Sequence, residues 1–513
     1  MELVNPAADL DGILTGCSGI AARGTLRAPS SNEMRPAARQ PHPAQPNFSA
    51  TMFFTDDRPE SIPIHLIYED DCESWRSAQA PATQAWLTAN VFKGERSKVL
   101  LIPGAQGEPV AVVAGLGRKQ PHEDVNCWNA AGLPDRLPDG SYHLAQPLSA
   151  GAAAQFAFGW AYGQYRFERY RRAAPPRSVF LRLPEQVPVA EVERLRAACA
   201  LARDLINTPA SDLTPESLAD AAREVAKSHG AEFRQVVGDA LLAEKFPAIH
   251  AVGRASAVAP RLIDIEWGEP SHPKVTLVGK GVCFDTGGLD IKPGASMLLM
   301  KKDMGGAAAV LALAQIVMDA QLPVRLRVII PAVENAIAGN AFRPGDVLST
   351  RKGLYVEVGN TDAEGRLILC DALALADEAK PDLLIDLATL TGAARVALGP
   401  ELPAMFCADE AVATQLVRTA AAESDPLWQL PLWSGYDDEL SSKVADLNNV
   451  SSSGFSGAII GALFLRRFVG AARVWVHIDL YAWNSKERPG RPVGAEAQCV
   501  RALFAFLKAR YGS

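Results

Sequence analysis

Short apolar runs alternate with longer helical stretches in the second half of this 513-residue chain. The apolar runs are typical of buried strands, and the stretches with helical periodicity are typical of helices. The expected strands are Lys274–Val278, Arg325–Ile330, Tyr355–Val358, Asp382–Asp386 and Arg473–Ile478, and the expected helices are Gly305–Asp319, Arg366–Lys380 and Ala458–Phe468. This alternation predicts a largely parallel or mixed sheet with helices on both faces. Ligands of such sheets bind outside the carboxyl ends of the strands.

The first half of the chain predicts a smaller α/β unit. Strands are expected at Ile64–Tyr68, Val99–Pro103, Pro109–Leu116 and Ser178–Leu183, and a helix over Ala152–Tyr170. Two further helices, Val189–Leu205 and Pro215–His229, should bridge the halves, and Thr214 before Pro215 is a helix-start signal. We therefore expect a two-domain α/β fold. A small N-terminal α/β domain spans residues 52–188, and a larger C-terminal α/β/α domain with a central mixed sheet spans residues 189–513, linker helices included.

Residues 1–51 are rich in Ala, Pro, Ser and Arg and show little periodicity, so we expect a disordered tail. Leu14–Cys17 looks like a lipoprotein cleavage box. The residues before it include Glu2, Asp9 and Asp11 and form neither a basic start nor an apolar core, so we reject a signal peptide. A misassigned start site or an organelle transit peptide would also explain the tail.

Composition narrows the classes of function. The net charge of −7 argues weakly against a general nucleic-acid binder. The eight cysteines are scattered without a CxxC pair, which favours free thiols in a reducing compartment and a cytoplasmic location. The eight histidines form no HExxH or other close pair. A metal, if one is bound, is therefore not held by the usual histidine and cysteine cluster.

Charged and polar residues follow the expected strands of the second half. They are Lys280, Asp285 and Lys292 after the first strand, Glu334 and Asn335 after the second, Asp362, Glu364 and Arg366 after the third, Thr389–Gly392 after the fourth and Asp479 after the fifth. They would gather at one edge of the sheet, and Asp362 and Glu364 could point the same way from an extended loop. Converging carboxylates repel unless cations separate them, and such oxygen-rich clusters hold divalent metals. The alternative is a set of unrelated loop acids with arginine partners.

Five motifs resemble one known family in the family's own order. They are GKGVCFDTGGLDIKP from Gly279, MKKDMGGAA at Met300–Ala308, RPGD at Arg343–Asp346, NTDAEGRL at Asn360–Leu367 and DLATLTGA at Asp386–Ala393. Together they resemble the leucine aminopeptidases (cytosol aminopeptidase, peptidase family M17) over roughly residues 195–513. The resemblance implies a metal-dependent aminopeptidase that releases N-terminal amino acids from peptides by a water activated between two metals. Residues 189–513 would then form the di-metal peptidase domain.

The resemblance also implies a set of metal ligands: Lys280, Asp285, Asp303, Asp362 and Glu364. One metal would lie among Asp285, Asp362 and Glu364, with the backbone carbonyl of Asp362, and the other would take Lys280, Asp285, Asp303 and Glu364. The family uses manganese, zinc, magnesium or cobalt. Lys280 can act as a ligand only as a neutral amine, because an ammonium has no lone pair. Its pKa must therefore fall from about 10.4 to about 7 or below.

Further roles follow from the same resemblance. Lys292 would stay charged and polarise the scissile carbonyl, and Arg366 would hold a bicarbonate that serves as the general base. Substrate contacts fall on Met300, Asn360, Thr389, Leu390 and Gly392. The implied substrates are peptides with a free N-terminus, and the implied assembly is a homohexamer. Neither a membrane nor a nucleic acid is expected as a partner.

Toward the C-terminus the sequence resembles the aminopeptidase family less closely. The family has small residues after its His-x-Asp strand, whereas this chain has HIDLYAWN, in which Tyr481 adds bulk. Trp483 is either the family's own tryptophan drawn closer by a deletion or further bulk. We expect a narrowed or reshaped pocket for the substrate side chain. Asp290 is interpreted as a loop acid.

Two other classes of function remain as alternatives. A two-metal phosphohydrolase would also need clustered carboxylates, but it would more often include histidine ligands. A DNA-binding architectural role, alone or in addition, is known for some relatives and would show as a salt-dependent shift in a DNA-binding assay.

Overall fold

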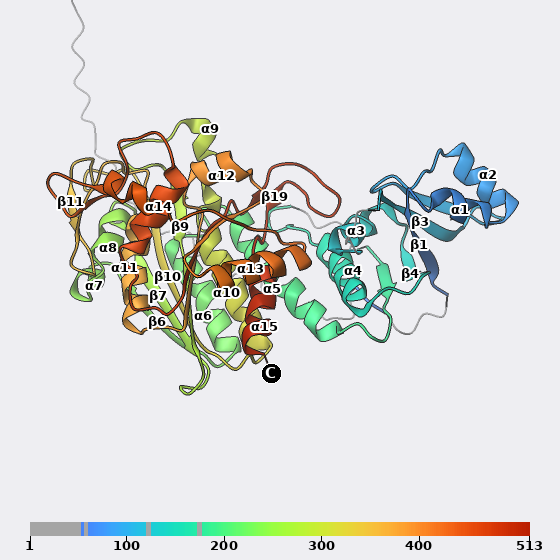
Figure 1. Ribbon diagram of the computed structural model, residues 1–513, viewed down its shortest axis with the longest axis horizontal. Coiled ribbons are helices and arrows are strands. Elements are labelled where there is room, and N and C mark those ends of the chain that lie inside the picture. The colour runs from blue at the N-terminus through green and yellow to red at the C-terminus, as the bar shows by residue number, and fades with distance from the viewer. Residues whose placement is uncertain (1–52, 56–59, 120–124, 172–176, 513) are drawn as a thin grey trace, which may run out of the picture. The chain divides into compact units, whose positions relative to one another are not determined.

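The computed structural model describes residues 53–55, 60–119, 125–171 and 177–512 (Figure 1). The tail expected at residues 1–51 and the domain start expected at residue 52 lie outside these residues. Within the described part, the chain forms a five-stranded sheet, a nine-stranded sheet and two small sheets. No helix in this part is long and apolar enough to cross a lipid bilayer.

The five-stranded sheet belongs to the N-terminal domain and has the order β2-β3-β1-β4-β5. Its strands are β1 (Ile62–Tyr68), β2 (Val99–Pro103), β3 (Pro109–Gly117), β4 (Gly140–Leu144) and β5 (Val179–Arg182), and its helices are α1 (Cys72–Ser77), α2 (Pro81–Ala89), α3 (Cys127–Ala131) and α4 (Ala150–Gly163). The pair β2–β3 is antiparallel and the other neighbours are parallel. The strands expected from the apolar runs are all present.

The helix expected over Ala152–Tyr170 ends early, at Gly163. Gly163 packs against the neighbouring helix so closely that an added Cβ would lie 1.8 Å from the carbonyl oxygen of Ala131. The Arg166 guanidinium then donates to the free carbonyl of Gly163 (2.9 Å). This contact satisfies a carbonyl that a longer helix would have used, so the aromatic residues beyond it belong to a loop.

The nine-stranded sheet is mixed, as expected. Its order is β15-β14-β17-β13-β8-β10-β7-β6, with the short strand β9 also paired to β10. The strands are β6 (Glu232–Val237), β7 (Arg261–Trp267), β8 (Lys274–Gly279), β9 (Gly281–Asp285), β10 (Arg325–Asn335), β13 (Leu383–Ala388), β14 (Ala404–Cys407), β15 (Trp428–Gln429) and β17 (Trp475–Asp479). Neighbours are parallel from β17 to β10. β7 is antiparallel to β10, β6 is antiparallel to β7, and β14 is antiparallel to β17.

Helices cover both faces of this sheet (Figure 1). One face carries α5 (Val189–Asn207), α6 (Pro215–Ser228), α10 (Gly305–Asp319), α13 (Glu410–Ala422) and α15 (Val500–Tyr511). The other carries α8 (Pro247–Gly253), α11 (Glu364–Glu378) and α14 (Gly457–Arg466), and the short helix α7 (Ala240–Ala243) precedes α8. Every residue of β13 is buried, as a central strand covered on both faces requires. The expected capping signal is confirmed, because the Thr214 hydroxyl accepts from the backbone N–H of Ser217 at the start of α6.

The third expected strand does not belong to the main sheet. It forms β12 (Tyr355–Glu357), which pairs with β11 (Val347–Ser349) and β16 (Leu447–Asn448) in a separate small sheet. Tyr355 is exposed and Val356 is buried, which is the alternation of a half-exposed strand. The prediction that all five polar segments follow strands of one sheet is therefore wrong for Asp362 and Glu364.

A second small sheet follows β17. It consists of β18 (Trp483–Asn484) and β19 (Gly494–Ala495). Trp483 is buried in the same apolar core as α5, α10 and α15. The seven cysteines within the described ranges are all free and buried.

Candidate metal centre

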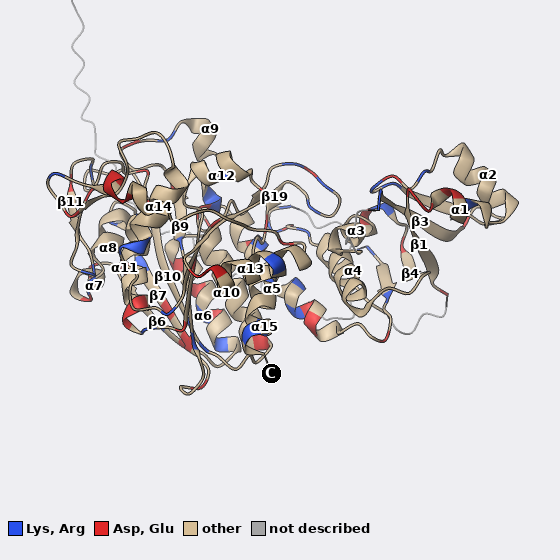
Figure 2. Cartoon of the chain, in the orientation of Figure 1, with Lys and Arg blue, Asp and Glu red and all other residues tan. Residues whose placement is uncertain are grey.

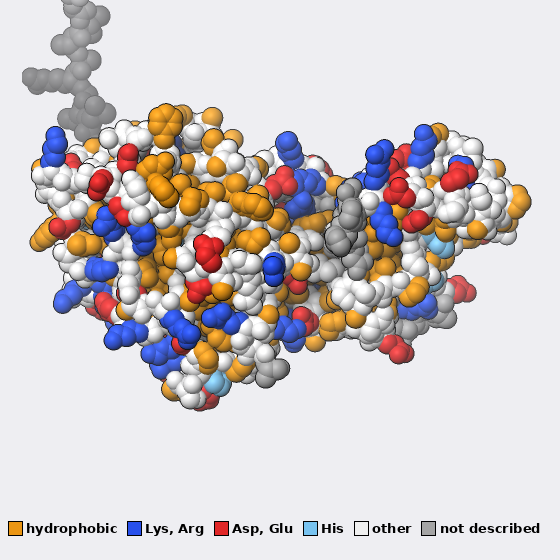
Figure 3. All heavy atoms as spheres, viewed as in Figure 1, with side chains coloured by type: hydrophobic (Ala, Val, Ile, Leu, Met, Phe, Trp, Pro, Cys, Tyr) orange, Lys and Arg blue, Asp and Glu red, His pale blue; other side chains and the backbone are white. Residues whose placement is uncertain are grey.

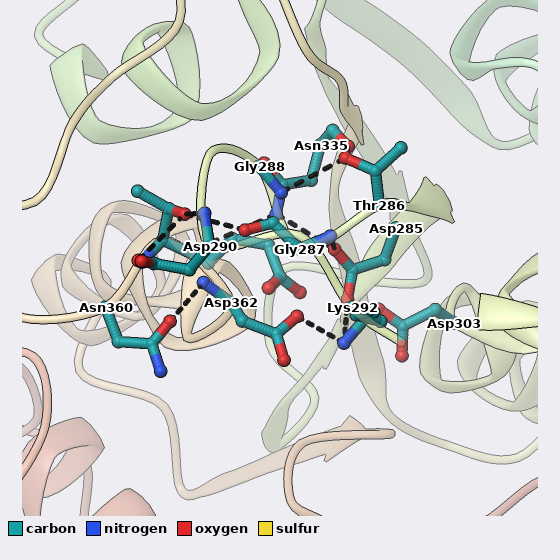
Figure 4. Close-up of polar contacts among 12 residues, drawn as sticks. Asp285, Thr286, Gly287, Gly288, Asp290, Lys292, Asp303, Asn335, Asn360 and Asp362 are labelled. Atoms are coloured by element: carbon teal, nitrogen blue, oxygen red, sulfur yellow. Dashed lines mark hydrogen bonds and ion pairs between the residues drawn. The ribbon is translucent and has the colours of Figure 1, made fainter. Parts of the chain in front are cut away.

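The loop after β9 doubles back on itself and brings Lys292 to Asp285 (Figure 4). Gly287 and Gly288 have φ angles of +87° and +65°, which a residue with a side chain rarely adopts. The backbone N–H of Lys292 then donates to the carbonyl of Thr286 (2.9 Å). As a result the Lys292 ammonium lies 2.8 Å from Asp285 Oδ2 and also pairs with the carboxylate of Asp362.

Lys280 lies between β8 and β9 and points into the same cluster. Its ammonium is 2.8 Å from Asp303 Oδ2 and 3.0 Å from Glu364 Oε1, and it donates to the carbonyl of Thr389 (2.8 Å). Gly365 makes room for it, since a Cβ there would lie 2.6 Å from Lys280 Cε and 2.7 Å from Nζ. A side chain at position 365 would therefore have to displace the Lys280 ammonium from its carboxylate partners.

Three of the predicted ligands converge on one point. Oxygen atoms of Asp285, Asp303 and Glu364 all lie within 4.8 Å of one another, and the three residues are buried. Glu364 Oε2 is a buried oxygen with neither a hydrogen bond nor an ion pair to any described residue. A buried carboxylate oxygen without a partner is costly, and a divalent cation is the partner that clustered carboxylates suit. The residues therefore fit a metal.

The charges of the cluster perturb one another. Burial, Asp285 and Asp303 raise the pKa of Glu364 above its ordinary value, although the two lysines oppose this shift. Burial lowers the pKa of Lys280, but the carboxylates of Asp303, Glu364 and Asp285 outweigh burial and raise it overall. With these carboxylates alone Lys280 is an ammonium. The neutral amine expected from the sequence thus requires a dication among the carboxylates.

Asp362 and Glu364 do not share an extended loop, which corrects the prediction. Asp362 lies in a turn, and Glu364 is the first residue of α11. Asp362 contacts Lys292, whereas Glu364 contacts Lys280. Each carboxylate therefore has its own cation, which reduces the repulsion between them. Burial and Asp285 still raise the pKa of Asp362.

Two polar residues, Asn335 and Asp290, hold the loops of the acidic cluster in place by hydrogen bonds. Asn335 is fully buried, and its Nδ2 donates to Asp285 Oδ1 (2.9 Å) and to the carbonyl of Thr361 (3.1 Å). Asp290 Oδ2 accepts from the backbone N–H of Thr361 (2.7 Å), and the Asp290 N–H donates to the Thr361 hydroxyl (2.9 Å). Asp290 is thus more than a loop acid, because it ties the loop of Lys292 to the loop of Asp362.

Arg366 is buried in the first turn of α11, close to Glu364 in sequence. Its Nη1 donates to the carbonyl of Asn449 (2.6 Å), and it forms no ion pair with any described residue. Burial lowers the pKa of Arg366 to about 10, and Glu364 and Asp479 act against this shift.

Asn449 is a site residue that the sequence analysis missed. It is fully buried, its Oδ1 accepts from the backbone N–H groups of Gly359 and Asn360, and its Nδ2 donates to the carbonyl of Asn360. It therefore shapes the segment that leads to Asp362. Nothing in its spacing distinguishes it from other loop asparagines, so no sequence signal could have found it.

The segment expected to contact substrate is anchored from two sides. The Thr389 hydroxyl donates to Asp303 Oδ1 (2.7 Å). The backbone N–H groups of Leu390 and Thr391 donate to Asp479 Oδ1, at 2.9 and 3.2 Å. Asp479 therefore does not join the acidic cluster but positions this segment instead.

The other predicted substrate residues lie around the cluster. Gly392 begins helix α12 (Gly392–Leu398), and Met300 begins the 3-10 turn that leads to Asp303. The Asn360 side chain accepts from the backbone N–H of Asp362 (2.7 Å), so its oxygen already has a partner within the loop.

Comparison with known protein families gives two matches along the chain. Residues 200–504 match the model of the cytosol aminopeptidase family, catalytic domain. Residues 62–184 match the model of the M17 aminopeptidase, N-terminal domain.

Individual relatives agree with these matches. The chain is 40% identical over 407 residues to a probable cytosol aminopeptidase of Geobacter sp. (strain M21), covering 73% of this chain and 82% of the relative. It is 37% identical over 458 residues to a probable cytosol aminopeptidase of Parasynechococcus marenigrum, covering 84% and 93%.

Solved structures are similar over most of the chain. The crystal structure of a cytosol aminopeptidase from Coxiella burnetii has a TM-score of 0.85 and 44% identity, and the match covers 90% of this chain and all of that one (100%). A bottromycin maturation enzyme in complex with Mn has a TM-score of 0.80 and 33% identity, covering 88% and 99%.

Proposed function

Because this chain belongs to the cytosol aminopeptidase family, it is a peptide hydrolase of the metal-dependent aminopeptidase type, and we propose how its own residues carry out that reaction. The observation that carries the proposal is the buried group of Asp285, Asp303 and Glu364, with oxygen atoms within 4.8 Å of one another and a lysine on either side.

Five residues would hold two divalent ions: Asp285, Asp362 and Glu364 for one, and Lys280, Asp285, Asp303 and Glu364 for the other. Manganese and zinc are the leading candidates, with magnesium or cobalt as others, and the similar structure in complex with Mn supports manganese. Such ions supply Lewis acidity for the peptide carbonyl and lower the pKa of a water. Asn335 supports this set by fixing the orientation of Asp285.

Lys292 would polarise the scissile carbonyl. Burial lowers the pKa of Lys292, but the carboxylates of Asp285 and Glu364 raise it by more than burial lowers it. The side chain therefore stays an ammonium. Its position beside Asp285 and Asp362 puts a fixed positive charge next to the reacting group, where negative charge develops on the oxygen. Electrostatic stabilisation of this kind acts most strongly in a site that excludes water.

Arg366 would bind a bicarbonate that accepts the proton of the attacking water. The guanidinium uses Nη1 for the carbonyl of Asn449, and its other N–H groups have no hydrogen-bond partner in the described part of the chain. A planar fork of donors suits a planar anion. The buried position of Arg366 near Glu364 would keep that anion close to the acidic cluster.

Peptides with a free N-terminus are the proposed substrates. The segment Thr389–Gly392, held by Asp479, would contact the substrate backbone together with Met300 and Asn360. Tyr481 adds an aromatic ring nearby, and it would narrow or reshape the pocket for the first side chain. A weaker preference for leucine over alanine than in typical relatives is the expected consequence.

We also propose that the chain assembles as a homohexamer, and that it works in the cytosol, the location that its relatives' name carries. Figure 3 shows hydrophobic side chains gathered on the face that carries α12 and the short helix α9 (Gly294–Met297). Three of the most exposed apolar residues are Leu298, Val396 and Phe455, at 79%, 85% and 82%. A patch of this kind supports burial against another copy of the chain.

The alternative functions gain little support. Basic and acidic residues are interspersed over the elements in Figure 2, without a one-signed basic face in that view. The group of potential metal ligands in the described part contains carboxylates and no histidine, unlike the set expected for a phosphohydrolase.

The proposal is tested by hydrolysis of aminoacyl anilides before chelation, after complete metal removal and after metal is added back. We expect activity to disappear with the metal and to return on addition of Mn²⁺ or Zn²⁺, and Asp362→Asn to be inactive under all conditions. Activity that survives complete metal removal, or that is unchanged in Asp362→Asn, would overturn it.

A further inference from the structure

The ring of Tyr481 lies against two cations. Lys302 Nζ is 4.5 Å from the centre of the ring, and the guanidinium carbon of Arg395 is 4.9 Å from it. Both distances are within the range of a cation–π contact. Tyr481 is therefore part of a cationic cluster, which we define as Lys302, Arg395 and Tyr481.

Neither cation of this cluster forms an ion pair with an acidic residue of the described part. Lys302 is only 4% exposed, yet its side-chain ammonium makes no hydrogen bond and no ion pair with any residue that the structure describes. The Arg395 guanidinium also lacks a hydrogen bond or ion pair within the described ranges, and it is permanently charged. Buried lysines are nearly always paired, because an unpaired charge loses its hydration without compensation.

The guanidinium of Arg395 is permanently charged in the neutral pH range. Lys302 places a second basic group on the same aromatic ring. The cluster therefore presents two basic side chains, neither of which forms a salt bridge with a carboxylate of the described residues.

The cationic cluster is adjacent to the candidate metal centre. Lys302 directly precedes Asp303 in the turn that begins at Met300, and Arg395 lies on α12, the helix that starts at Gly392. These are the segments that should contact the first residue of the substrate. The cluster is thus placed where the side chain of that residue would lie.

The backbone around Tyr481 is held firmly in this position. Its N–H and the N–H of Ala482 both donate to Gln498 Oε1, at 3.0 and 2.9 Å, and Gln498 Nε2 donates to the carbonyl of Pro400 (2.8 Å). Ala482 packs so close to Gly305 that an added Cβ there would lie 2.4 Å from the methyl group. The backbone that carries the aromatic ring is therefore anchored at this position.

We propose that Lys302, Arg395 and Tyr481 select peptides whose N-terminal residue carries a carboxylate side chain, glutamate or aspartate. The inference rests on the proposed aminopeptidase function and names its substrate class. A carboxylate would complete the pairing of both cations, and the ring of Tyr481 would pack against the methylene groups of the side chain. A glutamine side chain has nearly the same shape but lacks the charge, so it isolates the electrostatic contribution.

The test compares kcat/KM for the p-nitroanilides of glutamate, glutamine and leucine, using the metal-loaded full chain. In the unaltered protein, glutamate should exceed glutamine by about tenfold or more. Lys302→Gln and Arg395→Gln should each lower this ratio by about fivefold or more. The ratio is measured within each variant, so a general loss of activity cancels.

Lys301→Gln is the matched control. Lys301 is the neighbouring lysine, but its ammonium donates to the carbonyl of Asn207 (2.6 Å). Its substitution should leave the glutamate-to-glutamine ratio within about twofold of the original value, since it removes a charge outside the cluster. Inhibition by free L-glutamate and L-glutamine gives a second readout, and glutamate should be the stronger inhibitor only while Lys302 and Arg395 are both present.

Two outcomes would overturn the inference: a ratio near one in the unaltered protein, or a ratio that neither Lys302→Gln nor Arg395→Gln changes. Arg395 is exposed, so its substitution tests the idea even if Lys302→Gln does not fold. Cleavage of the leucine and glutamine anilides without a preference for glutamate would refute this inference alone. Failure to cleave any anilide would instead refute the proposed function.

Discussion

Metal binding should release protons from this site, and Lys280 is the reason. Its ammonium lies 2.8 Å from Asp303 Oδ2 and 3.0 Å from Glu364 Oε1, and these carboxylates hold its pKa above the ordinary value. An ammonium has no lone pair, so Lys280 must lose its proton before it can ligate a metal. Lys292 is not a ligand in this account and keeps its proton.

The structure indicates how many protons should be released when a metal binds. Lys280 contributes one proton, and Glu364, whose pKa is also raised, contributes a further fraction near neutral pH. Both groups hold protons more tightly in the protein than in isolation, so metal affinity falls as pH falls. Release of about one to two protons corresponds to a change in affinity of about tenfold to a hundredfold per pH unit, or about 1.4–2.8 kcal/mol.

Calorimetric titration of the chelator-treated protein with Mn²⁺, in buffers of different ionisation enthalpy, measures this release. The observed enthalpy should vary with the buffer in proportion to about one to two protons near pH 7. Lys280→Met should release about one proton fewer, and Lys292→Met should match the unaltered protein. No proton release, or the same release in Lys280→Met, would refute the assignment of Lys280 as a metal ligand.

Three further substitutions test the geometry of the site. Gly365→Ala places a methyl group against the side chain of Lys280, so metal affinity should fall about 10–100-fold without any change in charge, as measured by competition with a chromophoric chelator. Asn335→Leu removes the hydrogen bond to Asp285 and should weaken metal binding by a similar factor of about 10–100 in the same assay. Lys292→Met should lower kcat about 10²–10³-fold in steady-state kinetics while metal affinity is retained. Unaltered affinity in the first two variants, or unaltered kcat in the third, would contradict these assignments.

The sequence predicted the central strands well because burial on both faces leaves a clear pattern. β8 and β13 are nearly continuous apolar runs, as parallel strands between two helical layers must be. The sequence places Tyr355–Val358 in the main sheet, whereas β12 pairs with β11 and β16, because a short alternating run carries no information about its partner strand. The helix expected to continue beyond Gly163 ends there, where the Arg166 guanidinium donates to the Gly163 carbonyl that a further turn would use.

The candidate site was predicted in a similarly uneven way. Spacing alone left a metal site and a set of unrelated acids both open for Asp362 and Glu364, and the ordered motifs favoured the metal. The structure brings Lys280 and Glu364 together from segments far apart in the chain. Asn449 could not be predicted, because its role consists of hydrogen bonds to Asn360, which lies 89 positions earlier in the chain.

The cationic cluster around Tyr481 shows what the structure adds to the sequence. The sequence identified Tyr481 as added bulk, from its position after the strand that ends at Asp479. It gave no reason to connect that ring with Lys302 or Arg395, which come from two other segments. Charge selection at the first side chain is therefore an inference that requires the folded chain.

Anomalous diffraction from crystals of the Mn²⁺-loaded protein tests the central claim most directly. The account predicts two ions about 3.5–4 Å apart that share the carboxylates of Asp285 and Glu364. Lys280 Nζ should be a ligand of one ion, and Lys292 Nζ of neither. A single ion, ions bound elsewhere, or a Lys280 side chain remote from both ions would contradict it.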